Sequence, residues 1–144
     1  MIRYCIFTDG SCRANGNGGI GIVWLKNGEK VYEYSKGFKN VTNNKMELMA
    51  INIALCSIKK PIDSLEIVTD SEYCIGVLTN PTWKPKKNIE LISVIKQQIE
   101  KTQKLVESPI KWTHTRGHQS DDSENTKWNL YVDKLAQNAS NMIL

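Results

Sequence analysis

The sequence predicts an α/β protein built on a five-stranded mixed sheet with helices on both faces. Three observations support this fold class. The chain opens with three strand-like segments, helical periodicity then begins, and strand-like and helical segments alternate to the end. With 144 residues, 40% of them hydrophobic, the chain can form one ordinary core, and we expect residues 1–144 to be a single domain.

The first three predicted strands are expected to be antiparallel. Residues 3–8 and 31–38 alternate apolar and polar side chains, and residues 19–25 form a short apolar run between them. The dipeptide Asn27-Gly28 separates the second strand from the third. Both central positions of a type I′ turn need positive φ, so this dipeptide is the strongest short-range indication of a hairpin.

Helical periodicity starts after residue 43. Apolar side chains recur there at three and four positions, Asn43 or Asn44 can cap the helix, and Pro61 follows its end. Asn88 can cap a later helix that turns Ile92, Ile95 and Ile99 inward. The same criteria predict strands at 64–69 and 110–115, helices at 71–78 and 129–143, and loops at 80–87 and 116–127.

Composition excludes some classes of protein. No stretch approaches the ~20 apolar residues of a membrane span, and the N-terminus lacks a secretory signal, so we expect a cytoplasmic protein without membrane contact. The net charge of +4 is only a weak indication of a polyanionic partner. The four cysteines lack metal-site spacing, and we expect free, mostly buried thiols.

Four acidic residues fall near the ends of predicted elements. Asp9 ends the first strand and Asp70 the fourth, whereas Glu47 and Asp133 lie in the first turns of two helices. If the first and fourth strands are neighbours, Asp9 and Asp70 emerge at the edge where open α/β sheets bind ligands. Clustered carboxylates repel one another and need a cation such as Mg²⁺ between them. Each acid taken alone could instead be a turn residue, a cap or a partner of a helix dipole.

Five segments resemble the motifs of type 1 ribonucleases H and occur in the family's order. The resemblance spans nearly the whole chain and implies a ribonuclease H-like fold. It also implies hydrolysis of the RNA strand of RNA–DNA hybrids by two Mg²⁺ ions, with Mn²⁺ as a possible substitute, leaving 5′-phosphate and 3′-hydroxyl ends. The segments are FTDGSC at 7–12, TNNKMELMA at 42–50, TDSEY at 69–73, GH at 117–118 and DKLA at 133–136.

The resemblance implies a role for each acid. Asp9 would bridge two ions, Glu47 and Asp70 would complete the shell of one, and Asp133 that of the other. His118 would lie on a loop and assist proton transfer or product departure, for which the near-neutral pKa of imidazole is suited. The alternative for His118 is a solvated loop histidine.

The resemblance also implies the substrate contacts. An enzyme specific for hybrids must sense the 2′-hydroxyl of RNA, and asparagine amides can both donate to it and accept from it. Helix capping is the alternative for the asparagines of the second motif, and a loop anchor packed on the core is the alternative for Trp83. The matching positions are Cys12 (backbone), Asn15, Asn43 and Asn44 for the RNA strand, and Thr42, Asn88 and Trp83, beside Lys84, Lys86 and Lys87, for the DNA strand.

The chain departs from the family pattern at three places. The span from Asp70 to Asn88 lacks the extended basic handle of many relatives, so we expect weaker, strongly salt-dependent binding. His118 and Asp133 are 15 positions apart, a longer spacing than the family leads us to expect, and Glu72 stands where relatives often carry glutamine. We expect a monomer. Two alternatives stay open: a non-catalytic module that binds hybrids or duplexes, and a DNA-acting nuclease of the same superfold.

Overall fold

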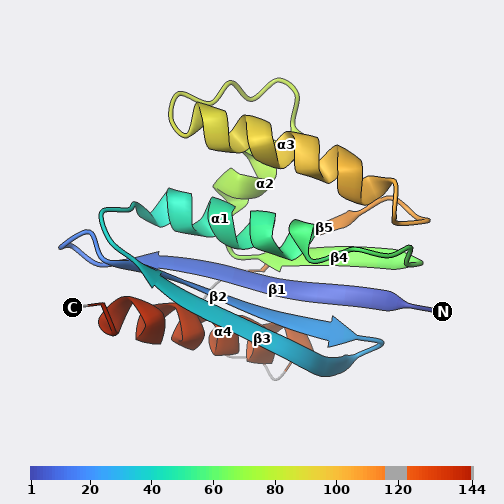
Figure 1. Ribbon diagram of the computed structural model, residues 1–144, viewed down its shortest axis with the longest axis horizontal. Coiled ribbons are helices and arrows are strands. Elements are labelled where there is room, and N and C mark those ends of the chain that lie inside the picture. The colour runs from blue at the N-terminus through green and yellow to red at the C-terminus, as the bar shows by residue number, and fades with distance from the viewer. Residues whose placement is uncertain (116–122, 144) are drawn as a thin grey trace.

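The computed structural model describes residues 1–115 and 123–143, and within them one mixed sheet forms the centre of the molecule (Figure 1). The strand order is β3-β2-β1-β4-β5, in which β1, β2 and β3 are antiparallel and β4 and β5 join in parallel. This arrangement confirms the predicted fold class, including the adjacency of β1 and β4. The strands are β1 (Arg3–Cys12), β2 (Gly18–Lys26), β3 (Glu29–Phe38), β4 (Ser64–Thr69) and β5 (Lys111–His114).

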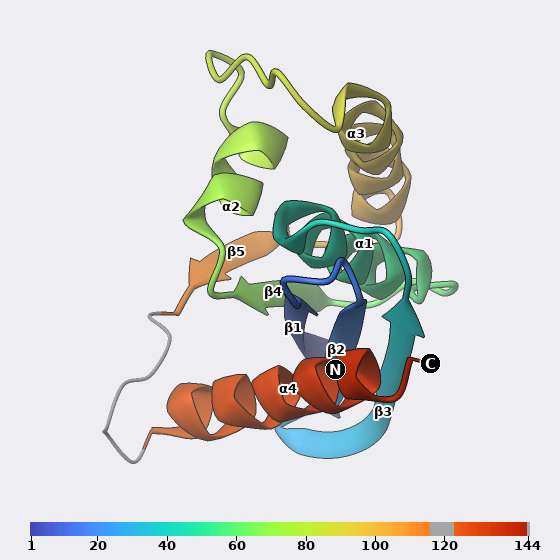
Figure 2. The ribbon, with the colours of Figure 1, turned by 90° about the vertical axis from the view of Figure 1, so that its left-hand side faces the viewer.

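Helices cover both faces of the sheet (Figures 1 and 2). On one face α1 (Asn43–Cys56) packs against the sheet, with α2 (Glu72–Thr79) and α3 (Ile89–Gln103) beyond it; α4 (Glu124–Asn141) covers the other. A large apolar cluster lies on the α1 side, and a smaller one around Phe7, Val23 and Val132 lies under α4. Burial on both faces explains why β2 is apolar along its length instead of alternating. Among the described residues, no helix is both long and apolar enough to cross a bilayer.

The predicted hairpin turn is confirmed, but β1 is longer than predicted. Asn27 and Gly28 both have positive φ, at 50° and 87°. β1 continues through Gly10 to Cys12 because its last residues pair with the glycine-rich start of β2, where Asp9 lies opposite Gly21. Asp9 is therefore inside the central strand, not at its end. The alternation of side chains stops at Gly10, which is why the sequence pattern ended the strand too early.

The caps of α1 and α3 also differ from prediction. Thr42, not Asn43 or Asn44, is the N-cap of α1, and its hydroxyl accepts the Lys45 N–H. Glu47 therefore falls in the second turn. Asn88 does precede α3, but its backbone is left-handed, with φ 57°, and its side chain makes no capping hydrogen bond.

The last helix begins five residues before its predicted start. Ser123 caps α4 by accepting the Thr126 N–H, so residues 124–127, predicted as loop, are helical. Their polar side chains hide the periodicity on which the prediction depended. As a consequence, Asp133 lies in the middle of α4, not in its first turns. The cysteines are free as expected, but only Cys74 is fully buried and the other three are half-buried.

Candidate active site

The fold brings three of the predicted acids together. Asp9 on β1, Glu47 on α1 and Asp70 just after β4 each place a carboxylate oxygen within 4.8 Å of the others. Because β1 and β4 are parallel neighbours, Asp9 and Asp70 share one edge of the sheet. Asp133 on α4 lines the same open cleft. Four acids from different parts of the chain therefore line one cleft. They meet there because β1 and β4 are neighbours in the sheet.

Gly10 and Thr69 hold the two most buried acids in place. Asp9 and Glu47 are only 2% and 4% exposed. The Gly10 N–H donates to Asp9 Oδ1 at 2.9 Å and also to Glu47 Oε1, and the Thr69 hydroxyl lies 3.5 Å from Glu47 Oε2. A Cβ on Gly10 would lie 2.4 Å from the Glu47 backbone nitrogen, so only glycine allows β1 and α1 to approach this closely.

The electrostatics of the cluster favour a bound cation. Burial is the main cause that raises the pKa of both Asp9 and Glu47, and the nearby charge of Asp70 raises both further. Asp133 is close enough to contribute to the raised pKa of Asp9. Two neighbouring buried carboxyl groups with raised pKa indicate a site that favours positive charge, since a divalent cation would lower the pKa of both.

An unpartnered oxygen tests whether the site fits a metal ion. Asp9 Oδ2 is buried and, among the described residues, accepts no hydrogen bond. A buried acceptor without a partner is costly and needs an explanation. The carboxylates of Glu47 and Asp70 lie close to that of Asp9, and carboxylate oxygens are ligands that Mg²⁺ and Mn²⁺ prefer. The residues present therefore fit a hard divalent cation.

Asp133 is oriented within its own helix. Gln137, one turn further along α4, donates from Nε2 to Asp133 Oδ2 at 2.9 Å. His118, the other predicted catalytic residue, lies outside the described residues.

The predicted substrate-contact residues divide into two neighbouring groups. Asn43 and Cys12 line the cleft of the acids. Asn15 lies in an exposed turn, where its Oδ1 accepts the Asn17 N–H, and it lines neither pocket. The second group forms an adjoining pocket with the loop that follows α2: Thr42, Asn44, Trp83 and Asn88, together with Lys84, Lys86 and Lys87.

Trp83 packs as a loop anchor and is also partly exposed, so a contact with DNA stays a prediction. Its ring meets Tyr73 edge-on, with centroids 6.1 Å apart, and packs so closely on Gly76 that a Cβ there would lie 2.3 Å from the ring. Trp83 is nevertheless 40% exposed and lines the lysine-bearing pocket. Trp24 is buried and Trp112 packs against the core, as expected.

Three further residues at the site were not predicted. Ser11 lines the cleft, and its Oγ is buried without a partner among the described residues. Ser71 lines it too and caps α2 by accepting the Cys74 N–H. His114 ends β5, with Nε2 3.3 Å from the Asp70 carbonyl oxygen. The position of His114 at the carboxyl end of a strand parallel to β4 was the signal that could have identified it.

The fold and the site together define a class: an α/β protein in which a buried acid of the central strand lies in a cluster of carboxylates that could hold a metal ion. The family model described as RNase H matches residues 2–141. The chain therefore belongs to the ribonuclease H family, and its likeness is to the type 1 enzymes.

Individual relatives agree with this assignment. A ribonuclease H of Actinobacillus pleuropneumoniae is 36% identical over 149 residues, covering 94% of this chain and 89% of the relative. LC11-RNase H1, isolated from compost, has a TM-score of 0.78 at 24% identity and covers 98% of this chain and 97% of its own. The same protein has been solved in complex with an RNA/DNA hybrid, with a TM-score of 0.73, 23% identity and 96% coverage of both chains.

Proposed function

We propose that this chain is an endonuclease that hydrolyses the RNA strand of RNA–DNA hybrids with two divalent metal ions. The observation that supports it most is the cluster of Asp9, Glu47 and Asp70, whose oxygens lie within 4.8 Å of one another around an unpartnered Asp9 Oδ2. A metal-dependent site of this kind fits the family to which the chain belongs.

Four side chains would hold the ions. Asp9 would bind both, Glu47 and Asp70 would complete one shell, and Asp133 the other, with Mg²⁺ as the native ion and Mn²⁺ as a substitute. Bound divalent ions would supply the charge that activates the attacking water and stabilises the leaving oxygen. The cleavage would leave 5′-phosphate and 3′-hydroxyl ends.

The residues around the acids would orient them. Gly10 holds Asp9 and Glu47 through its single N–H, and Gln137 holds Asp133. These hydrogen bonds would hold the carboxylates in fixed positions while charge develops on the substrate during the reaction, as a preorganised site requires. His118 stays a proposal for proton transfer or product departure.

The two pockets would bind the two strands of a hybrid. Asn43 and Cys12 beside the acids fit the RNA strand, where an amide can recognise a 2′-hydroxyl. Asn44, although it lines the lysine-bearing pocket, and Asn15, which lines neither pocket, would add to this contact. Thr42, Asn88 and Trp83 in the lysine-bearing pocket fit a DNA backbone. LC11-RNase H1, which has a similar fold, has been solved with an RNA/DNA hybrid, and this supports a hybrid as the substrate. We also propose a monomeric, single-domain protein without a basic handle, whose free thiols fit the cytoplasm.

A cleavage assay tests the proposal. A hybrid labelled on its RNA strand should be cut with Mg²⁺ and not with EDTA, and duplex DNA of the same sequence should stay intact. Asp9→Asn should abolish cleavage and preserve hybrid binding. Cleavage that survives Asp9→Asn would refute the assignment. Hybrid binding without cleavage in Mg²⁺ or Mn²⁺ would favour the binding module, and cutting of the DNA duplex would favour a DNA nuclease.

A further inference from the structure

Ser11 lies in the cleft of the acids, and the proposed function gives it no role. In the part of the chain that the structure describes, Ser11 Oγ and Asp9 Oδ2 are the two buried side-chain oxygens that have no hydrogen-bond partner. Both residues line the cleft. A buried hydroxyl without a partner costs free energy and needs an explanation. Because both atoms occur in one cleft, a single ligand of this cleft can explain both.

Ser11 and Asp9 point to the same side of the sheet. They are two residues apart on β1, and side chains at this spacing share one face. Gly19 of β2 is the cross-strand partner of Ser11, and a Cβ on Gly19 would lie 2.2 Å from the Ala136 carbonyl oxygen of α4. Paired residues of neighbouring strands point to the same face, so Ser11 and Asp9 both face α4. This helix carries Asp133, which lines the same cleft.

The chemistry of a hydroxyl fits the water around a cation better than the cation itself. Mg²⁺ binds carboxylates directly and usually keeps several of its waters, whereas a serine hydroxyl can both donate to a water and accept from it. Side chains two residues apart on a strand are separated by roughly 7 Å, which leaves room for a water between Ser11 and an ion on Asp9. The acids themselves do not satisfy the hydroxyl, because none lies within hydrogen-bond distance of Oγ.

We propose that Ser11 is a positioning residue that binds a water in the hydration shell of the divalent cation shared by Asp9 and Asp133. This inference rests on the proposed function and adds a fifth side chain to the metal site. Through this water, the hydroxyl fixes the position of the ion on the α4 side of the cleft. Removal of such an outer partner typically weakens metal binding roughly 10- to 100-fold.

Metal binding and urea unfolding of the full chain test the proposal without substrate. Ser11→Ala removes a hydroxyl that has no partner, so the metal-free variant should unfold at a urea concentration no lower than the parent does. Its Kd for Mn²⁺, measured by electron paramagnetic resonance of the free ion, should be about tenfold higher than that of the parent. In a cleavage assay, the Mg²⁺ concentration that gives half of the maximal rate should also rise about tenfold, while the maximal rate should change less than about threefold.

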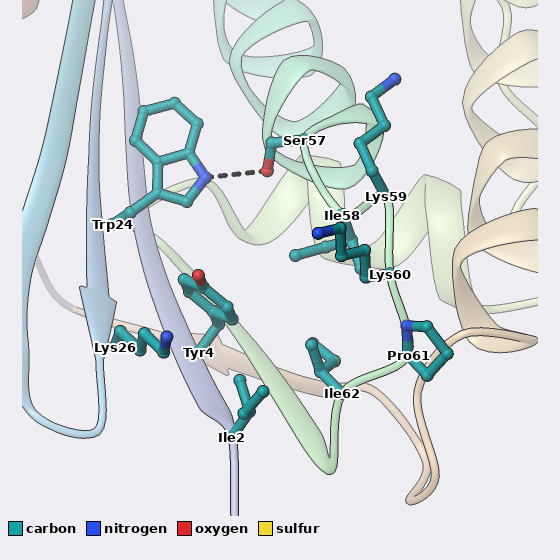
Figure 3. Close-up of a pocket in the computed structure, with 10 residues that line it drawn as sticks. All are labelled: Ile2, Tyr4, Trp24, Lys26, Ser57, Ile58, Lys59, Lys60, Pro61 and Ile62. Atoms are coloured by element: carbon teal, nitrogen blue, oxygen red, sulfur yellow. Dashed lines mark hydrogen bonds between the residues drawn. The ribbon is translucent and has the colours of Figure 1, made fainter.

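Ser57 provides the matched control because its hydroxyl already has two partners. It accepts the Trp24 indole N–H at 2.8 Å (Figure 3) and donates to the Ala54 carbonyl oxygen at 2.6 Å. Ser57 lines a pocket with Tyr4, which is seven residues before Ser11 on β1 and so roughly 23 Å away along the strand. Ser57→Ala should therefore unfold at a lower urea concentration than the parent, and its Kd for Mn²⁺ should stay within about twofold of the parent value.

The results that would overturn the inference differ from those that would overturn the proposed function. If Ser11→Ala binds Mn²⁺ as tightly as the parent, or if the metal-free variant loses as much stability as Ser57→Ala, the hydroxyl has only a structural contact and this inference alone is wrong. If the parent binds no Mn²⁺, or if Asp9→Asn binds it equally well, the proposed function is wrong and the inference falls with it.

Discussion

Replacing Gly10 with alanine should impair the candidate active site while the protein stays folded. The added Cβ would lie 2.4 Å from the Glu47 backbone nitrogen and 2.5 Å from the Met46 carbonyl carbon. Both neighbours are backbone atoms, so neither can rotate away. β1 and α1 would have to separate by about 1 Å to reach an ordinary contact, an overpacking that typically costs ~1–3 kcal/mol of the free energy of unfolding.

The same displacement would disturb the hydrogen bonds that position the acids. Gly10 donates to both Asp9 and Glu47, so a shift of β1 against α1 moves one carboxylate relative to the other. A misplacement of about 1 Å in a preorganised site can lower the rate ~100-fold. We therefore expect Gly10→Ala to stay folded, bind Mg²⁺ about tenfold more weakly, and cleave a hybrid about 100-fold more slowly at saturating Mg²⁺.

A matched glycine separates this effect from a general loss of stability. Gly37→Ala would place a Cβ 2.5 Å from the Ala139 carbonyl oxygen at the far end of α4, away from β1 and α1. It should lose similar stability in urea unfolding, yet retain cleavage within about twofold at a temperature where both variants are folded. If Gly10→Ala binds Mg²⁺ and cleaves like the parent, or if Gly37→Ala loses activity equally, the reasoning about Gly10 is wrong.

Three further predictions follow from the charges of the molecule. Mg²⁺ at 100 times its Kd should add about 2.7 kcal/mol to the free energy of unfolding; Asp9→Asn should lose this gain, and Glu100→Gln, on the exposed side of α3, should keep it. Burial, with the Glu66 carboxylate beside it, raises the pKa of Cys5 to about 12. The folded chain keeps this proton at pH values where the unfolded chain has lost it, so the free energy of unfolding measured with urea should fall from about pH 9 upward. The fall should be less steep in Cys5→Ala, and an identical dependence on pH in both proteins would contradict this prediction. Replacing the three lysines of the loop after α2 with glutamine should reduce the salt slope of hybrid affinity by about 2 to 3, and an unchanged slope would show that they contact no phosphate.

The elements that the sequence predicted well are those with local signals. The Asn27-Gly28 turn needs only its own two residues to adopt positive φ, and it does. The apolar stripe of α1 placed Met46, Ala50 and Ala54 inward, and all three are buried. Such patterns are decided by residues within one or two turns of one another, so a single sequence contains the information.

The errors of prediction arise where the structure depends on residues that are far apart in the sequence. The end of β1 depends on its pairing with the glycines at the start of β2, which no window around Asp9 contains. At the start of α1, threonine and asparagine are both good caps, and only the extended backbone of Thr42 selects between them. The early turns of α4 are polar and are fixed by Ser123 and by Trp128 packing under the sheet.

The candidate site shows the same division. The motifs identified the acids, but their meeting required the order of β1 and β4 in the sheet. The roles of Gly10 and Gln137 become visible only as contacts. Glu72 is exposed in the first turn of α2, and nothing in the structure explains its departure from the glutamine that the resemblance leads us to expect.

The position of Asp9 inside β1 affects how the enzyme loses activity on heating. β1 is bonded to β2 on one side and to β4 on the other, and it lies under helices on both faces. Amide hydrogens in such a strand exchange with solvent only when the whole molecule opens. Asp9 pairs with Gly21 of β2, two residues beyond the point where pairing with β4 ends, and is therefore held more firmly than a residue on a loop. Heat inactivation and global melting should coincide, with no temperature range in which an intact fold carries a disordered acid cluster.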